Sequence, residues 1–598
     1  MSNILSFIQW LYEHPQALKR RFLPTVIAII SLIVYQWLGI DQYFEEFARP
    51  WIMAGALALI SGLWAYASIV LPHDKRFFKR TERLISEMCY QKAEELLTRR
   101  HFFMGKAGDV NRKILLVRLL NDKDDLATGY DLIRDIERLA LLPKELQKLR
   151  VAKAKLLLDS GNYERFEEEM ALVNVSDLRN TDYYNLYFLL QSRKVEINGD
   201  YPKAKRILEK SLSTASSDVE RIVSYNNLAR LEDRSGHLNI ALSYYEKAWE
   251  LLQNVHKPEL YKSIGHNIII LYTQDGKPNK AREILSEIET RIDKKNPEQY
   301  LLFLNEQIIL ARQLEDRVLL ESSYEKLDTD VISRINEHKR FMIKVSELRM
   351  RLSDGFSFQK HFERLILEQL PAQQLTKDER IRVYRELWIA CTQGMSQLPD
   401  KILNKAMPLI INELFALEPY VDQKIRSISP ELPVLRVYWL GNKLAIIKVK
   451  LADEQKQHGY SNLWQQSISQ LFRLLEEKCS LWAERKNVEE EIDALIGFVD
   501  EYRSYAPAIK LTLRESLQQS ALDKLNRLEK TLSQGWPYPG RAHYAISLAY
   551  LHWILTGDVK TSKYWIERFE EQKISLSHHM GWLRCWYEEV KKAIASSN

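Results

Sequence analysis

The stretch Tyr225–Leu251, YNNLARLEDRSGHLNIALSYYEKAWEL, decides the fold of this chain. It consists of two amphipathic helical segments joined by a turn at Gly236. Small side chains such as Ala229 and Ala241 let paired helices approach closely, and large ones such as Tyr245 fill the space between neighbouring pairs. The stretch therefore predicts one helix–turn–helix unit.

Turn signals recur along the chain at a nearly constant period. Each lies between two amphipathic stretches, and successive turns are 37 to 40 residues apart. The turns are at Gly161, Gly199, Gly236, Gly276, Asp316, Gly355 and Gly394. Self-similarity at such a period is typical of a solenoid of helical repeats. A further unit is expected around Gly557.

Residues Tyr183–Arg291 resemble tetratricopeptide repeats (TPRs). The positions that carry the resemblance are Leu228, Ala229, Leu238, Ala241, Tyr245 and Ala248 in the central unit, Ser192, Gly199, Tyr201, Ala204 and Leu208 before it, and Tyr272, Gly276, Pro278, Ala281 and Leu285 after it. Bulky Phe166 and Ile269 stand where the family has small residues. The period exceeds the family's usual ~34 residues, so longer helices or turns are expected.

Two apolar stretches precede the repeats, Phe22–Ile40 and Trp51–Leu71. Neither contains Asp, Glu, Lys or Arg, and each is close to the ~20 residues that a helix needs to cross a bilayer. We expect a transmembrane hairpin over residues 22–72, after an N-terminal segment 1–21 that is either an interfacial helix or a frayed end. The alternatives are a cleaved signal peptide followed by one span, or two buried helices of a soluble core.

The charges around these stretches predict an orientation. Basic residues lie at Lys19–Arg21 and Lys75–Arg80, whereas the connecting segment 41–50 is acidic. Lys and Arg near span ends stay on the cytoplasmic side. We therefore expect an integral protein of the cell's inner or cytoplasmic membrane, with both termini and the repeats cytoplasmic.

The formal net charge of +6 is small for 598 residues and does not by itself indicate nucleic acid. Residues 73–118 hold twelve Lys and Arg against six Asp and Glu, directly after the second apolar stretch. Attraction to anionic lipid headgroups is the expected role of this surplus, with RNA or an acidic protein as the alternatives. The cysteines, Cys89, Cys391, Cys479 and Cys585, form no C-x-x-C motif and suit a reducing compartment.

No sequence motif of catalysis is present. The chain lacks G-x-x-x-x-G-K-[ST], G-x-G-x-x-G, H-E-x-x-H and G-x-S-x-G. The pair His578-His579 has no further ligands at zinc spacing, and the run Glu489–Glu491 is expected on a solvated helix face. The sequence predicts neither an enzyme, nor a cofactor, nor a metal site.

One segment interrupts the helical pattern. Val434–Leu440 and Lys443–Lys450 are β-rich and flank Gly441-Asn442, a two-residue turn signal, so a small β-hairpin is expected near 434–450. A boundary should fall near 425–452 whether or not the hairpin forms. The expected organisation is all-α otherwise, with a repeat array over 73–425 and a Trp-rich helical region over 426–598.

The TPR resemblance implies a binding surface. In that family the first helix of each unit lines a concave groove, and an Asn on it commonly bonds the ligand backbone. The groove positions of this sequence are Arg193, Asn226, Asn227, Arg230, His266 and Asn267. Amide side chains both donate and accept, and Arg favours carboxylates. The alternative is that the Asn side chains bond to neighbouring helices.

These features together predict a membrane-anchored scaffold or adaptor that recruits a protein or extended peptide. A peptide-sensing regulator is the first alternative. An enzyme with an unrecognised site in the Trp-rich region is the second.

Overall fold

The computed structural model describes residues 73–597, except for 87–88, 100–105, 180, 182, 198–199, 216, 236, 256–257, 328–336, 354–357, 486, 534–542 and 572–580. The predicted membrane hairpin, residues 22–72, and the segment 1–21 lie outside the described residues. None of the helices within the described ranges combines the length and the apolar character needed to span a bilayer. The chain divides into two compact units, Met1–Ala152 and Lys153–Asn598.

The described part of the first unit is a small helical bundle. It contains α5 (His73–Ser86), α6 (Tyr90–Thr98), α7 (Lys106–Asp122), α8 (Leu126–Glu137) and the start of α9 (Pro143–Asp159). Phe77, Ala93, Leu97 and Leu119 are among the side chains of its core. This core holds α5 against α6 and α7.

The second unit begins with the end of α9 and continues through a long series of helices. The first helices are α10 (Tyr163–Ala171), α11 (Tyr183–Ile197), α12 (Tyr201–Thr214), α13 (Asp218–Arg234), α14 (Leu238–Leu252), α15 (Pro258–Gln274), α16 (Pro278–Arg291), α17 (Pro297–Gln313) and α18 (Arg317–Lys326). They are followed by α19 (Glu337–Ser353), α20 (Phe358–Arg364), α21 (Lys377–Gln393), α22 (Asp400–Ser427), α23 (Pro433–His458), α24 (Asn462–Glu484), α25 (Val488–Tyr505), α26 (Leu511–Ser533), α27 (His543–Thr556), α28 (Val559–Glu571) and α29 (Gly581–Ser597). Single turns of other helix types are η3 (Val175–Leu178), η6 (Leu365–Gln369), η7 (Leu370–Ala372) and η8 (Met395–Gln397).

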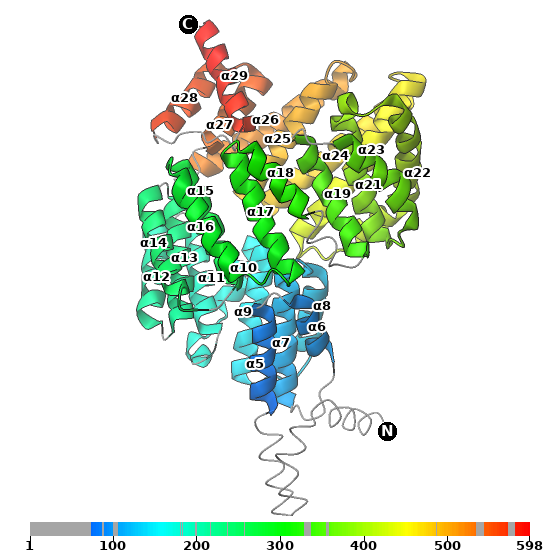
Figure 1. The fold of residues 1–598 in the computed structure, drawn as a ribbon. Coiled ribbons are helices and arrows are strands. Elements are labelled where there is room, and N and C mark those ends of the chain that lie inside the picture. The colour runs from blue at the N-terminus through cyan, green and yellow to red at the C-terminus, as the bar shows by residue number, and fades with distance from the viewer. Residues whose placement is uncertain are drawn as a thin grey trace, which may run out of the picture. The chain divides into compact units, whose positions relative to one another are not determined.

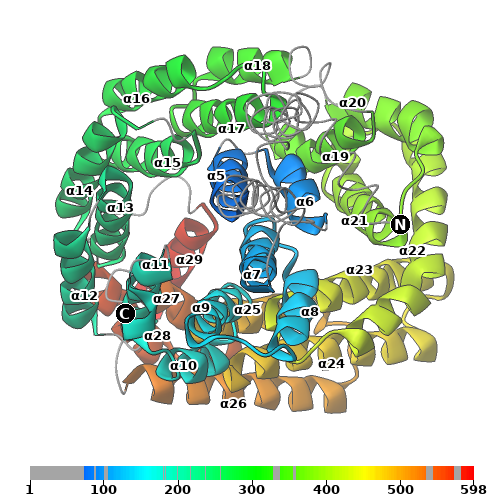
Figure 2. The ribbon, with the colours of Figure 1, turned by 90° about the horizontal axis from the view of Figure 1, so that it is seen from below.

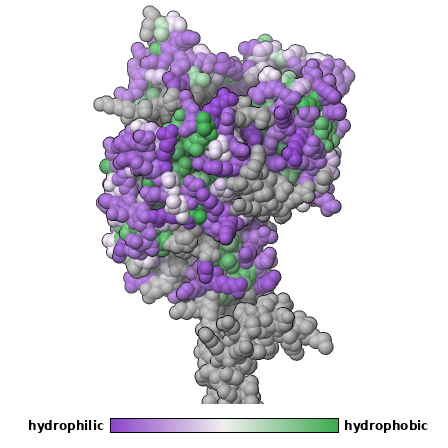
Figure 3. Space-filling model, viewed as in Figure 1, coloured by the Kyte–Doolittle hydropathy of each residue, from purple (hydrophilic) through white to green (hydrophobic). Residues whose placement is uncertain are grey.

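Consecutive helices of the second unit pack as pairs, which confirms the predicted helix–turn–helix repeats (Figure 1). Figure 2 shows that the first helix of each pair lies on the inside of a curved array and the second on the outside. The inner helices include α13, α15, α17, α21 and α23, and the outer ones α14, α16, α18, α22 and α24. This is a TPR-like arrangement. Most of the side chains on the face shown in Figure 3 are hydrophilic, with separate apolar groups among them.

The small residues of the repeats lie in the core. Ala204, Ala229, Ala241 and Ala281 are all fully buried. Bulky Phe166 and Ile269 are also fully buried, so the packing of their units accommodates a large side chain at these positions.

Several of the predicted turns have the backbone conformation that glycine permits. Gly161 and Gly276 have φ of 77° and 69°, in the left-handed region that other residues adopt at a cost. The next helix then begins with its own cap: Asn162 Oδ1 accepts a hydrogen bond from the Arg165 N–H at the start of α10. Gly199, Gly236 and Gly355 lie outside the described residues.

The predicted β-hairpin at 434–450 is wrong, because this segment lies within α23. One side of α23 contributes Leu444, Ile447 and Leu451 to one core, and another side contributes Trp439 and Ile446 to a second core. A helix that is buried on two sides has a nearly continuous apolar run, which resembles that of a strand. The predicted division into 73–425 and 426–598 stays a prediction.

Candidate functional site

Three arginines of the inner layer surround one carboxylate. Arg193 on α11 and Arg234 on α13 place Nη1 2.7 and 2.8 Å from Oε1 of Glu196, and Arg230 Nη2 lies 3.5 Å from Oε2. Glu196 is fully buried, whereas the arginine side chains keep 15 to 30% of their surface exposed. The cluster thus joins two successive inner helices through one buried carboxylate.

A second carboxylate lies close by on α13. Glu232 accepts from Lys205 Nζ at 2.6 Å and is 2.8 Å from His237 Nδ1. Burial alone would raise the pKa of Glu232, but the hydrogen bonds from Lys205 and His237 outweigh it and hold the pKa below its usual value. The hydrogen bond to Glu232 in turn raises the pKa of Lys205. Glu232 is therefore ionised at neutral pH and fixes α12 against α13.

Of the predicted amide positions, Asn227 bonds within its own helix. Asn227 Nδ2 donates to the carbonyl of Val223 at 2.7 Å, one turn earlier on the same helix, rather than to a neighbouring helix. Asn226 Oδ1 is buried and accepts no hydrogen bond from the residues that the structure describes. Asn267 is half-buried on α15. The structure therefore leaves the amide donor of Asn227 engaged within its own helix.

His266 also bonds within the array. Its Nδ1 lies 2.5 Å from Oε2 of Glu306, so it joins α15 to the next inner helix, α17. The structure thus brings Arg193 and Arg230 together at one carboxylate, while it places His266 at a separate contact.

Sequence reasoning missed Glu196, Arg234 and Glu306. Glu196 and Arg234 each lie just before a predicted turn glycine, at the end of an inner helix. Opposite charges at corresponding places in successive units were the signal that could have identified this pair.

A similar cluster lies further along the inner layer. Arg349 on α19 and Arg385 on α21 approach the two oxygens of Glu386, at 2.7 and 3.1 Å. Arg385 Nη1 also donates to Asn442 Oδ1 on α23 at 2.7 Å, and its guanidinium lies over the ring of Tyr438. Arginines around one buried carboxylate thus recur on the inner face.

The tryptophans of the C-terminal helices are largely core residues. Trp464 and Trp482 are almost fully buried in one large apolar cluster. Trp464 and Trp482 are therefore core residues. The expected solvated helix face at Glu489–Glu491 is wrong for Glu491, which is buried and pairs with Arg527.

The groups with reactive chemistry are dispersed. Burial raises the pKa of the Cys391 and Cys479 thiols to about 12, so both stay protonated at neutral pH. Within the described ranges, no three His, Cys, Asp or Glu side chains gather so as to hold a metal ion. The pair His578-His579 lies outside these ranges.

No family model matches this sequence, and no curated protein matches it. Among solved structures, the crystal structure of the P58(IPK) TPR domain is 14% identical, and the match covers 62% of this chain and 99% of that one, with a TM-score of 0.17. The APC/C hetero-tetramer Cut9–Hcn1 is 13% identical over 84% of this chain and 98% of that one, with a TM-score of 0.19. A circular tandem repeat protein with novel repeat topology is 14% identical over 95% and 97%, with a TM-score of 0.17. The TPR-like assignment rests on this chain's own helix pairs.

Proposed function

We propose that this chain is a membrane-anchored adaptor whose helical repeats bind a protein or an extended peptide. The predicted hairpin over residues 22–72 holds it in the inner or cytoplasmic membrane of the cell. The charge pattern around the hairpin supports a cytoplasmic location for both termini and the repeats. The proposal includes no catalytic role and no cofactor.

The cluster around Glu196 is the observation that carries the binding role. Its three arginines belong to two inner helices and stay partly exposed, while the Glu196 carboxylate that they share is buried. Guanidinium groups bind carboxylates through paired, charge-assisted hydrogen bonds. An extended segment rich in Asp and Glu is therefore the ligand class that this face favours.

The first helix of the described chain supports contact with anionic lipids. Helix α5 begins directly after the predicted second span, and its Lys79, Arg80 and Arg83 side chains are exposed. Juxtamembrane cations are attracted to anionic headgroups by about 1 kcal/mol each. This contribution would hold the start of the repeats close to the bilayer surface.

The binding role is tested by fluorescence anisotropy of the full chain in detergent, with labelled acidic peptides and length-matched basic ones. Arg230→Ala with Arg234→Ala should weaken acidic-peptide binding about tenfold or more, since hydrogen bonds to charged groups contribute about 1.5–3 kcal/mol. The loss should be largest at low ionic strength because salt screens the remaining attraction.

The control is Lys247→Ala on the outer helix α14, which should leave the affinity unchanged. Equal affinity for acidic and basic peptides, or an unchanged affinity in the double variant, would rule out the arginine cluster as the binding site.

A further inference from the structure

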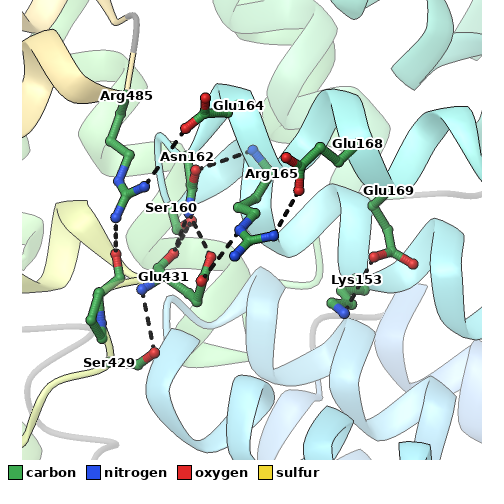
Figure 4. A network of polar contacts seen from close by, with 11 residues as sticks. Lys153, Ser160, Asn162, Glu164, Arg165, Glu168, Glu169, Ser429, Glu431 and Arg485 are labelled. Carbon is green, nitrogen blue, oxygen red and sulfur yellow. Dashed lines mark hydrogen bonds and ion pairs between the residues drawn. The ribbon is translucent and has the colours of Figure 1, made fainter.

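Three segments that are far apart in the sequence meet at one place within residues 153–598 (Figure 4). They are the turn Ser160–Asn162 before α10, the connection Ser429–Pro433 between α22 and α23, and the end of α24 at Trp482–Arg485. Contacts in a helical solenoid are normally confined to neighbouring repeats. This junction, which we call the clasp, joins the beginning of the repeat array to helices several repeats later.

The clasp supplies a hydrogen-bond acceptor to the N-terminus of α23. Helix α23 begins at Pro433, and its N-cap residue, Leu432, offers no side-chain acceptor. The first N–H groups of a helix lack intrahelical partners. The Val434 N–H instead donates to the carbonyl of Ser160 at 3.0 Å, so the turn before α10 caps α23.

Side chains reinforce this backbone bond. Asn162 Nδ2 donates to the carbonyl of Glu431 at 3.3 Å. Ser160 Oγ lies 3.3 Å from the same carbonyl oxygen, although its nearer acceptor is the Leu157 carbonyl at 2.8 Å. Asn162 Nδ2 also donates to Oε2 of Glu431 at 2.9 Å, while its Oδ1 caps α10. Ser160 and Asn162 are fully buried, so these bonds belong to a packed contact.

Gly161 is the point of closest approach. A Cβ atom at this position would lie 2.8 Å from Cζ3 of the buried Trp482 ring and 3.3 Å from Cγ2 of Val434. A side chain there would force the Trp482 ring or the turn itself to shift. Glycine is thus required at this turn for packing as well as for its backbone conformation.

Ion pairs surround the buried part of the clasp. Arg165 Nε lies 3.5 Å from Oε1 of Glu431, and Arg485 Nη1 lies 4.0 Å from Oε2 of Glu164. Arg485 Nη2 also donates to the carbonyl of Pro430 at 3.0 Å. One apolar core includes residues of α11–α13 together with residues of α23–α29, so packing supports the polar contacts.

We propose that the clasp is a conformational device that holds the repeat array closed on itself and opens as a unit. Opening separates the clasp together with the apolar core that joins α11–α13 to α23–α29. The contacts between successive helices can persist, because repeats are stabilised mainly by their neighbours. The closed form sets the curvature of the array and hence the spacing of the arginine clusters on the inner helices. This inference does not depend on whether those clusters bind a peptide.

The chain offers a matched pair of substitutions as a test. Gly161→Ala and Gly276→Ala place the same methyl group on a left-handed turn, with φ of 77° and 69°. Only the first meets a neighbour, since nothing lies within 4 Å of a Cβ at Gly276. The readout is hydrogen–deuterium exchange of the full chain, followed at the Val434 amide, whose acceptor is Ser160 in the closed form.

Gly161→Ala should accelerate exchange at Val434 about tenfold or more, while Gly276→Ala leaves it unchanged and α13–α18 stay protected. Equal exchange at Val434 in the two variants would overturn the proposal. If Gly161→Ala unfolds the chain, Glu431→Ala provides the test. Glu501→Ala is its control, because Glu501 pairs with Lys448 further along α23. Glu431→Ala should accelerate exchange at Val434 about fivefold, because it removes the hydrogen bond from Asn162 Nδ2 to the carboxylate and the ion pair with Arg165. An unchanged rate there would overturn the proposal.

Discussion

At the scale of single residues, the packing of the two helices within a repeat depends on small side chains. Ala241 is fully buried where α13 meets α14, so Ala241→Leu inserts three carbons into a filled contact. Overpacking of a core typically costs about 1–3 kcal/mol. The variant should therefore lower the thermal melting temperature of the full chain clearly.

The matched substitution is Ser235→Ala in the adjoining turn. It removes one hydrogen bond, from Ser235 Oγ to the Leu231 carbonyl at 2.8 Å, at a half-buried position. The cost should be at most about 1 kcal/mol. Equal and negligible effects of the two substitutions would contradict close helix packing at this unit.

The Glu232 carboxyl predicts a dependence of stability on pH. Its pKa in the folded chain lies below the ordinary value of 4.5 because Lys205 and His237 donate to it. The group therefore stabilises the fold above pH 4.5, and this contribution is lost as the pH falls through the lower, folded-state pKa. The melting temperature of Glu232→Gln should fall below that of the unmodified chain at pH 7, and the difference should narrow at pH 4.

Glu250→Gln is the control for this effect, since Glu250 is exposed on α14. The melting temperature of Glu250→Gln should stay close to that of the unmodified chain at both pH values. A Glu232→Gln difference that stays constant between pH 7 and pH 4 would show that the carboxylate does not contribute in this way.

At the scale of elements, the sequence predicted those helices whose apolar pattern is accompanied by a turn glycine and small residues. In the pair α13–α14, Gly236 and Ala229 identify the unit, although α13 contributes Leu228 to one core and Ile222 to another. Helix α23 lacks these signals: Ile446 and Ile447 pack into two different cores, and Gly441-Asn442 resembles a hairpin turn. The candidate site was predicted only in part for a related reason: Glu196 pairs with Arg230 and Arg234 across the space between two helices, which periodicity within one helix does not show.

The substitution Gly441→Ala distinguishes a helix from a hairpin at residues 434–450. It lies in the middle of the helix, and nothing lies within 4 Å of a Cβ at this position. Alanine there should stabilise the fold by about 0.5–1 kcal/mol, because glycine loses more conformational freedom in a helix. In a two-residue hairpin turn, by contrast, this position needs a positive φ, so alanine would destabilise it.

Melting temperatures of Gly441→Ala and Gly497→Ala provide the measurement. Gly497 lies within α25 with the same open space around its Cβ, so both variants should gain stability to a similar extent. A loss at Gly441 beside a gain at Gly497 would contradict the helix.

At the scale of the whole molecule, the proposed topology places the repeats and both termini on one side of the membrane and residues 41–50 on the other. A cysteine introduced by Gln42→Cys should then react with a membrane-impermeant maleimide in intact cells. The reason is the surplus of Lys and Arg that flanks both apolar stretches, which stays on the cytoplasmic side.

The native cysteines supply the control for this experiment. Cys585 is exposed on the protein surface, whereas Cys391 and Cys479 are buried. In the unmodified chain, Cys585 should therefore react only after the membrane is permeabilised, since the proposed topology places it on the protected side. Labelling of Cys585 in intact cells, together with protection of the cysteine at position 42, would reverse the orientation. If neither site is labelled until the cells are opened, the segment 41–50 does not cross the membrane and the two apolar stretches do not form a spanning hairpin.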